Sequence, residues 1–240
     1  MIEESDDWLE KRLSPRERTE PEAERRLISE ALLLEKLAPL GVSPRLLAHG
    51  RDARGPWHRV ERVRMPTLAA RIERGPSDAA WVERAAVAVL GALAALHEAT
   101  DELGPLGVVH ADPSPANIAV DESGERAVLL DFDLAWWRES APPADGAFRG
   151  TIGYVAPEVA RGERPTVRSD LFSVGASLLH ALTRERPRPG DSFPALLAMA
   201  AESPIAVPAQ TPEVVRRCLA FDPFLRPASA KEAACPLPAT

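Results

Sequence analysis

The chain has 240 residues, of which 45% are hydrophobic and 27% are charged, and its 36 acidic and 29 basic side chains give a formal net charge of −7. This length and composition are typical of a folded globular chain of one or two domains and exclude a disordered one. The acidic excess argues against nucleic acid as the main partner, because binding to a phosphate backbone requires a cationic face.

The N-terminal quarter predicts a helix and a pair of strands. In Pro21–Ala38, apolar residues recur at three- and four-residue steps, which predicts an amphipathic helix. Glu30 falls on the apolar stripe, so it either pairs with a cation in the core or lies at the edge of the stripe and reaches solvent. The segments Pro44–Gly50 and Trp57–Val63 are predicted strands around a turn at Asp52–Gly55.

Helices dominate the prediction for the rest of the chain. A second helix is expected over Ser77–Thr100, with Ser77 as its N-cap. Two β-like runs, Asn117–Val120 and Ala127–Leu130, flank a turn and predict a hairpin. After this hairpin the apolar pattern predicts further helices over Asp170–Leu182, Phe193–Ala201 and Pro212–Phe221.

The N-terminus and the cysteines predict a cytoplasmic protein. The first eight residues (MIEESDDW) are acidic and lack the apolar core of a signal peptide. The two cysteines, Cys218 and Cys235, form neither a disulfide framework nor a metal-binding motif. The longest apolar run, Ala85–Leu96, is too short to span a bilayer, so no membrane association is expected.

Three polar residues bracket the predicted hairpin. Asp112 and Asn117 lie on the loop before it, and Asp131 follows its second strand. Phosphoryl transfer requires one carboxylate to orient the attacking hydroxyl and oxygen ligands to hold Mg²⁺ on the phosphates. The three residues supply these groups, and the hairpin between them can bring the two loop ends together.

At these positions the chain resembles the protein kinase family. His110–Asn117 (HADPSPAN) is similar to the family's catalytic loop, and Asp131–Asp133 (DFD) is similar to its D-F-G motif. Gly150–Glu158 (GTIGYVAPE) resembles the peptide-positioning loop that ends in A-P-E. Ser169–Gly175 (SDLFSVG) resembles the start of the central helix of the large lobe, and Asp222–Pro227 (DPFLRP) resembles the late motif whose arginine pairs with the A-P-E glutamate. The five motifs occur in the family's order.

The resemblance implies an α+β fold of two lobes, the protein kinase-like bilobal fold. Residues 1–63 would form a reduced, β-rich N-lobe, and residues 64–240 would form a mainly helical C-lobe with the catalytic loop and the activation segment. In the C-lobe the resemblance implies a buried ion pair between Glu158 and Arg226.

The resemblance also implies roles for the residues of the catalytic loop. Asp112 would orient a substrate hydroxyl and accept its proton, and Asn117 and Asp131 would hold Mg²⁺. Thr151 would contact the catalytic loop, as the threonine at this position does in Ser/Thr kinases. The implied cofactors are ATP and Mg²⁺.

In the N-lobe the resemblance implies a nucleotide site. Glu30 would pair with Lys11, which would contact the phosphates of ATP; otherwise Lys11 is a surface residue of a charged arm. Val60 would line the adenine pocket, and Glu61 and Val63 would offer backbone hydrogen bonds to the base.

Four positions depart from the family pattern. The family covers the ATP phosphates with a glycine-rich hairpin that precedes the lysine, but the first glycine in this sequence is Gly41. Either the fold has lost its first two strands, or the chain starts downstream of the true beginning. Without the hairpin, weak nucleotide affinity is expected. Ala111 replaces an arginine that reads a phosphorylated activation loop, which removes the need for that switch. Ser114 replaces a lysine near the γ-phosphate, which should slow transfer. Asp133 replaces the glycine of D-F-G.

Three functions are consistent with these residues. The first is a Ser/Thr-type protein kinase that transfers the γ-phosphate of ATP to a protein hydroxyl with low activity. The second is a pseudokinase, a scaffold that binds a regulatory protein partner. The third is a small-molecule phosphotransferase, against which the loop Gly150–Glu158 argues, because such enzymes generally lack this platform.

Overall fold

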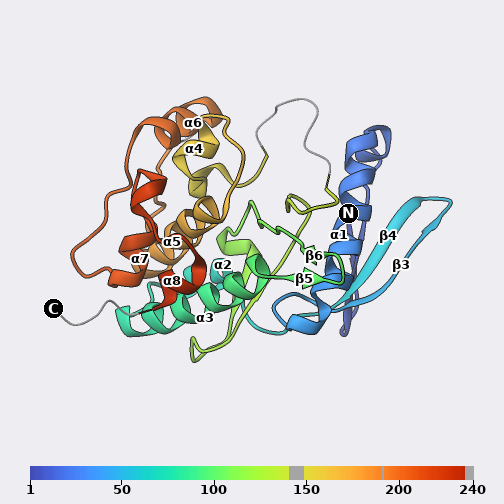
Figure 1. Cartoon of the computed structure of the whole chain (residues 1–240), viewed down its shortest axis with the longest axis horizontal. Coiled ribbons are helices and arrows are strands. Elements are labelled where there is room, and N and C mark those ends of the chain that lie inside the picture. The colour runs from blue at the N-terminus through green and yellow to red at the C-terminus, as the bar shows by residue number, and fades with distance from the viewer. Residues whose placement is uncertain (141–148, 191, 236–240) are drawn as a thin grey trace.

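The structure, a computed structural model, describes residues 1–140, 149–190 and 192–235, and its elements fall into two lobes (Figure 1). The N-lobe consists of a sheet of four antiparallel strands in the order β1-β2-β4-β3, with helix α1 packed against it. Its elements are β1 (Ile2–Glu4), β2 (Trp8–Arg12), α1 (Pro21–Leu37), β3 (Leu46–Asp52) and β4 (Gly55–Glu61).

Helix α1 forms where the apolar stripe predicts it. Pro21 occupies the first turn, where its missing N–H leaves no hydrogen bond unmade. The stripe residues Leu27, Leu34 and Leu37 are all buried. Glu30 is buried on the same stripe, so its carboxylate needs a partner inside the protein.

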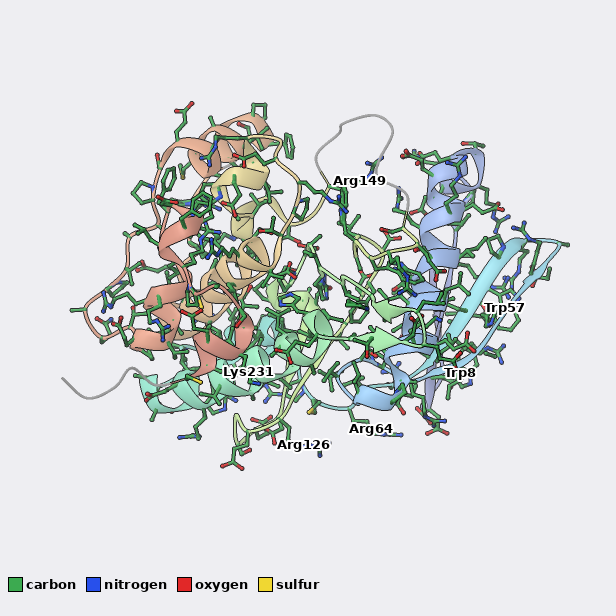
Figure 2. The ribbon with its side chains drawn as sticks, in the orientation of Figure 1. Trp8, Trp57, Arg64, Arg126, Arg149 and Lys231 are labelled. Atoms are coloured by element: carbon green, nitrogen blue, oxygen red, sulfur yellow. The ribbon has the colours of Figure 1, made fainter. Side chains whose placement is uncertain are left out.

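The face of the sheet away from α1 carries stacked arginine and tryptophan side chains. Because alternate residues of a strand point to opposite faces, Trp8 and Glu10 point away from Lys11, which contacts α1. The guanidinium of Arg59 lies 4.3 Å from the ring centroid of Trp8 and 5.4 Å from that of Trp57. Figure 2 labels both tryptophans on the N-lobe sheet. The buried Glu10 accepts hydrogen bonds from Arg12 and Arg59, which hold these side chains in place on this face.

The C-lobe is built around the helices α3 and α5, which pack against each other. Most of the residues of α5 are buried, and its N-terminus is closed by a reciprocal capping box of Thr166 and Ser169. The C-lobe helices are α2 (Leu68–Arg74), α3 (Ala79–His97), α4 (Pro157–Ala160), α5 (Val167–Thr183), α6 (Phe193–Glu202), α7 (Glu213–Cys218) and α8 (Ala230–Ala234). Two small hairpins lie between α3 and α4: β5 (Thr100–Asp101) with β6 (Gly104–Pro105), and β7 (Ile118–Val120) with β8 (Ala127–Leu129).

Most predicted elements are present, and two predictions are wrong. Helix α3 begins after Asp78, whose side chain accepts the N–H of Trp81, whereas Ser77 accepts a hydrogen bond from Arg71 and caps nothing. Strand β1 pairs with β2 ahead of Lys11, so the expectation that both strands before Lys11 are lost is wrong. The sequence pattern predicts none of the short elements β1, α2, β5, β6, α4 and α8. The lobe boundary at residue 63 stays a prediction.

One helix within the described residues, α3, is long and apolar enough to cross a membrane, by length and composition alone. The apolar run Ala85–Leu96, on which the expectation of no membrane span rests, is only part of α3, which extends beyond the run at both ends. Half of the most apolar stretch of α3 is buried inside the C-lobe, and a core helix of a folded domain has the same composition.

Candidate active site

Lys11 joins the two lobes through ion pairs. Its position on β2 directs the side chain toward α1, where its Nζ lies 2.8 Å from Glu30 Oε2. The same Nζ lies 2.6 Å from Asp131 Oδ1, which comes from the segment after β8 in the C-lobe. The pairing predicted for Glu30 is therefore formed, and Asp131 is a second partner of the same lysine.

The charges in this cluster act on one another. Burial works to lower the pKa of Lys11, but Glu30 and Asp131 more than offset it and hold the pKa above its usual range. Burial likewise works to raise the pKa of Asp131, and the Lys11 ammonium brings it below its usual range. For Glu30, burial prevails over Lys11 and raises the pKa to about 7. Lys11 is therefore a permanent cation at the junction of the lobes.

Glu30 also binds the backbone after Asp131. Its Oε1 accepts the N–H of Phe132 at 3.1 Å, so the carboxylate bridges Lys11 and the DFD segment. The ring of Phe132 is buried and lies 4.9 Å from the ring of His110. Asp131 has a φ of 58°, a left-handed conformation that Asp adopts more readily than most residues.

The catalytic loop places Asp112 among hydrogen-bond donors. Thr151 donates its backbone N–H to Oδ1 at 3.0 Å and its hydroxyl to Oδ2 at 3.1 Å. The side-chain amide of Asn117 donates to the backbone oxygen of Asp112 at 3.0 Å and to Oδ2 at 3.2 Å. Burial raises the pKa of Asp112, and the Thr151 hydrogen bonds oppose this. A carboxylate with a raised pKa in this position is suited to accept a proton.

The backbone of the catalytic loop is held by Asp170 of α5. The Asp170 carboxylate accepts the N–H groups of His110 at 2.8 Å and Ala111 at 2.9 Å, and it also contacts Nε2 of His97 at 2.9 Å. Ala111 has a φ of 68°, which is strained for a residue with a Cβ. The hydrogen bonds that His110 and Ala111 donate to this one buried carboxylate offset the strain and fix the residue before Asp112.

Asn117 and Asp131 fit a divalent cation that is bound together with phosphates. The nitrogen of the Asn117 amide faces Asp112, so its carbonyl oxygen is the atom left for a cation. The backbone oxygen of Asn117 accepts the N–H of Leu130 at 2.8 Å, which brings Asn117 next to Asp131. Among the described residues no group of three or more His, Cys, Asp or Glu side chains could hold a metal alone. Mg²⁺ does not need such a group, because it is commonly bound by one or two side chains and substrate phosphates.

The three residues proposed for the adenine pocket lie at the end of β4 and just after it. Val60 packs against the main hydrophobic core and pairs with Leu9 of β2. Glu61 uses its own N–H in a hydrogen bond of 2.9 Å to Arg45, so only its carbonyl could serve a base. Val63 lies beyond the end of the strand. Their contact with a nucleotide stays a prediction.

The loop Gly150–Glu158 is attached to the C-lobe by two buried arginines. Arg226 makes two hydrogen bonds to the Glu158 carboxylate, at 2.7 and 2.9 Å, so the predicted pair is formed and buried. Arg188 donates to the backbone oxygen of Val155 at 2.7 Å. Burial lowers the pKa of Arg188 to about 10. These contacts give the loop a fixed shape next to Asp112.

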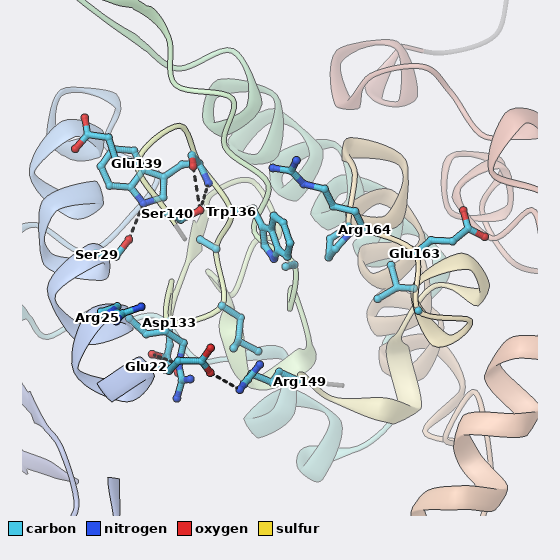
Figure 3. A pocket seen from close by; sticks show the side chains of 18 of the residues that line it. Glu22, Arg25, Ser29, Asp133, Trp136, Glu139, Ser140, Arg149, Glu163 and Arg164 are labelled. Carbon is cyan, nitrogen blue, oxygen red and sulfur yellow. Dashed lines mark hydrogen bonds and ion pairs between the residues drawn. The ribbon is translucent and has the colours of Figure 1, made fainter. Parts of the chain in front are cut away.

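A large cavity lies beside this cluster rather than between Lys11 and the end of β4. It has a volume of about 930 Å³ and lies between α1, the segment after Asp131 and the α4–α5 connection (Figure 3). Arginines from both lobes line it: Arg25, Arg26, Arg149, Arg161 and Arg164. Its apolar part includes Trp136 and Phe193. Residues 141–148, between the DFD segment and the loop Gly150–Glu158, lie outside the described residues.

Three residues that shape the site carry little signal in the sequence. Asp170 lies within the motif segment Ser169–Gly175, and this placement is the only indication of its role in the sequence. Asp133, noted only as a departure, lies 3.5 Å from Arg26 of α1. Trp137 contacts Ser29 across 108 positions of sequence, and no pattern in the sequence indicates this contact.

The comparisons with known proteins agree with the geometry. The model of the protein kinase domain matches residues 11–235. The serine/threonine-protein kinase PknL of Mycobacterium tuberculosis is 37% identical over 145 residues, which are 60% of this chain and 34% of PknL. The probable serine/threonine-protein kinase PkwA of Thermomonospora curvata is 31% identical over 182 residues, 73% of this chain and 23% of PkwA.

A third relative is named for a different acceptor residue. The tyrosine-protein kinase MasK of Myxococcus xanthus is 43% identical over 93 residues, 38% of this chain and 14% of MasK. The chain thus spans about a third or less of the length of the curated relatives described here.

Proposed function

The chain belongs to the protein kinase family, and from that membership we propose that it transfers the γ-phosphate of ATP to a serine or threonine hydroxyl of a protein, with low activity. One observation carries the proposal: Lys11 contacts both Glu30 and Asp131, while Asp112 and Asn117 lie hydrogen-bonded to each other on the adjoining loop. These are the groups that phosphoryl transfer needs, in one place.

Each residue has a proposed task in the reaction. Asp112 orients the substrate hydroxyl and accepts its proton, with Thr151 fixing both carboxylate oxygens. Lys11 neutralises phosphate charge, and Glu30 holds the lysine in place. Asn117 and Asp131 would hold Mg²⁺, whose charge stabilises the phosphates during transfer. Val60, Glu61 and Val63 would bind the adenine.

The proposed low activity has a structural reason. Ser114 stands where the family keeps a lysine near the γ-phosphate, and its side chain is buried, 2% exposed. A short buried hydroxyl cannot supply the missing positive charge, and catalysis of phosphoryl transfer is mainly electrostatic. The same observation favours the alternative of a pseudokinase that binds a regulatory protein partner.

Three measurements on the purified chain separate the possible functions. The first is the shift in unfolding midpoint on addition of ATP with and without Mg²⁺, in the wild type and in Asp131→Ala. The second is transfer of labelled phosphate to generic protein substrates, with the acceptor residue identified. The third is transfer to a panel of small hydroxylated compounds.

Each function predicts a different result. Transfer to serine or threonine supports the proposal, whereas transfer only to tyrosine would correct its acceptor. A wild type that shows no Mg²⁺-ATP shift and no transfer would favour the pseudokinase. Labelling of the small compounds alone would make the chain a small-molecule phosphotransferase. The fixed loop Gly150–Glu158 supports a peptide substrate over that last outcome.

A further inference from the structure

The segment that follows Asp131 touches α1 next to Glu30. The indole Nε1 of Trp137 donates a hydrogen bond of 2.8 Å to the hydroxyl of Ser29, the residue before Glu30. The dashed line at Ser29 in Figure 3 marks this bond. Trp137 is only 4% exposed, and its acceptor Ser29 is half-buried at the edge of the cavity. The contact connects the two lobes, and neither Lys11 nor a nucleotide takes part in it.

Trp137 is itself held firmly to the base of the catalytic loop. On one side Trp136 exchanges two backbone hydrogen bonds of 2.8 Å with Val109, the residue before His110. On the other side the N–H of Arg138 donates to the backbone oxygen of Leu106, also at 2.8 Å. The indole therefore projects from a paired backbone whose position is set by the C-lobe.

Helix α1 meets this segment with three residues of one face. Ser29 and Glu30 follow Arg26 by three and four residues, and this spacing places both next to Arg26 on the helix surface. Arg26 lies 3.5 Å from Asp133, and Glu30 accepts the N–H of Phe132. A continuous set of contacts thus leads from Val109 through Trp137 and Ser29 to the carboxylate that pairs with Lys11.

We propose that Trp137, acting through Ser29, is a positioning residue that holds α1 where Glu30 pairs with Lys11. If α1 moves away from the segment, the indole N–H of the buried Trp137 loses its acceptor, and a buried donor without a partner is unfavourable. The contact therefore favours the arrangement that binds nucleotide. Its effect on kinetics rests on the proposed function, but its effect on α1 does not.

The test compares two neighbouring tryptophans. Trp137→Phe removes the N–H donor and keeps an aromatic ring in the core. Trp136→Phe is the matched control, because the Trp136 indole contacts the C-lobe: the guanidinium of Arg164 lies 4.5 Å from the centroid of the Trp136 ring. On α1, Ser29→Ala removes the acceptor, and Ser29→Thr keeps a hydroxyl as the conservative variant.

Two readouts keep the inference separate from the proposed function. Hydrogen exchange followed by mass spectrometry reports the protection of α1 amides, with or without activity. The affinity for Mg²⁺-ATP and kcat/KM report the consequence for the site. A typical buried hydrogen bond corresponds to about a fivefold change in an equilibrium constant, and we expect affinity and kcat/KM to fall by about this factor in Trp137→Phe and Ser29→Ala.

The expected pattern is specific. Hydrogen exchange in α1 is faster in Trp137→Phe and in Ser29→Ala than in the wild type. In the double variant it is no faster than in either single variant, because both changes remove the same bond. Trp136→Phe and Ser29→Thr exchange like the wild type. Unchanged α1 exchange in Trp137→Phe would overturn the inference, as would an equal effect of Trp136→Phe. If neither the wild type nor any variant binds nucleotide, the proposed function fails. The exchange data still decide whether Trp137 positions α1.

Discussion

Thr151 donates two hydrogen bonds to Asp112, one from its backbone to Oδ1 and one from its hydroxyl to Oδ2. The two bonds engage both carboxylate oxygens and fix the orientation of the Asp112 carboxylate. They also tie the loop that begins at Gly150 to the catalytic loop. Position and chemistry of the proposed base are therefore set by the same pair of contacts.

The first prediction concerns Asp112. Replacing it with Asn keeps the shape of the side chain and removes the proton acceptor, so turnover should fall by about 100-fold or more, the usual contribution of a general base. The Kd for Mg²⁺-ATP should stay within about twofold, because Asp112 does not take part in the Lys11 ion pairs. Steady-state kinetics and a direct binding measurement test this. Equal losses of turnover and binding would mean that Asp112 has another role.

The second prediction concerns Asp131. Asp131→Asn should abolish the Mg²⁺-dependent part of the stabilisation by ATP, because the proposed metal ligand loses its charge. Thermal unfolding at fixed ATP, with Mg²⁺ or with a chelator, measures that part. Asp6→Asn is the control, since Asp6 is an exposed carboxylate of the β1–β2 turn. A full Mg²⁺ effect in Asp131→Asn would remove Asp131 from the metal site.

The third prediction concerns the buried pair of Glu158 and Arg226. Either Glu158→Ala or Arg226→Ala should lower the free energy of unfolding by about 3–5 kcal/mol, because the remaining charge is left buried without its partner. Urea unfolding provides the measurement. Glu213→Ala breaks the exposed pair with Arg216 and should change stability by about 0.5 kcal/mol or less. Similar effects for both pairs would contradict the assigned burial.

The fourth prediction is a pH dependence that arises from His58. Burial, followed by the charge of Lys11, lowers the pKa of His58 from 6.5 to about 4. Below pH 6.5 the unfolded chain therefore binds a proton at His58 that the folded chain does not, so the contribution of His58 to stability is lost as the pH falls toward 4. Glu30, whose pKa is raised in the folded chain, contributes in the opposite direction over the same range, so the effect of His58 is read from the difference between variants. Between pH 7 and pH 5 the loss from His58 amounts to about 2 kcal/mol.

A single substitution tests the assignment to His58. His58→Gln cannot take up the proton, so its stability should fall by about 2 kcal/mol less than that of the wild type between pH 7 and pH 5. Urea unfolding at the two pH values gives the difference. His49→Gln, at an exposed residue of β3 that faces His58 in the register, should behave like the wild type. The same pH response in wild type and His58→Gln would show that other groups cause it.

The sequence predicts the long elements and the order of the site residues well, because these depend on local patterns. Helix α1 follows from one apolar stripe and a proline in its first turn. The N-cap of α3 was misassigned because two capping residues stand side by side, and only the tertiary contact of Ser77 with Arg71 decides between them. Strand β1, with three residues, exists only through pairing with β2.

Contacts between distant segments could not be predicted in the same way. Glu30 and Lys11 were paired through the family resemblance, but the hydrogen bond of Glu30 to Phe132 has no sequence signature. The contact of Trp137 with Ser29 depends on where two lobes meet. Such contacts follow from packing, which composition and periodicity do not specify.

The way in which Asp170 holds the catalytic loop has a consequence for how this loop can diverge. Asp170 binds main-chain N–H groups of His110 and Ala111, and Ser177 donates its hydroxyl to the main-chain oxygen of Pro113 at 3.0 Å. A backbone gripped in this manner keeps its path whichever side chains it carries. Substitutions at positions 111 and 114 can therefore retune the chemistry over evolutionary time while Asp112 stays where it is.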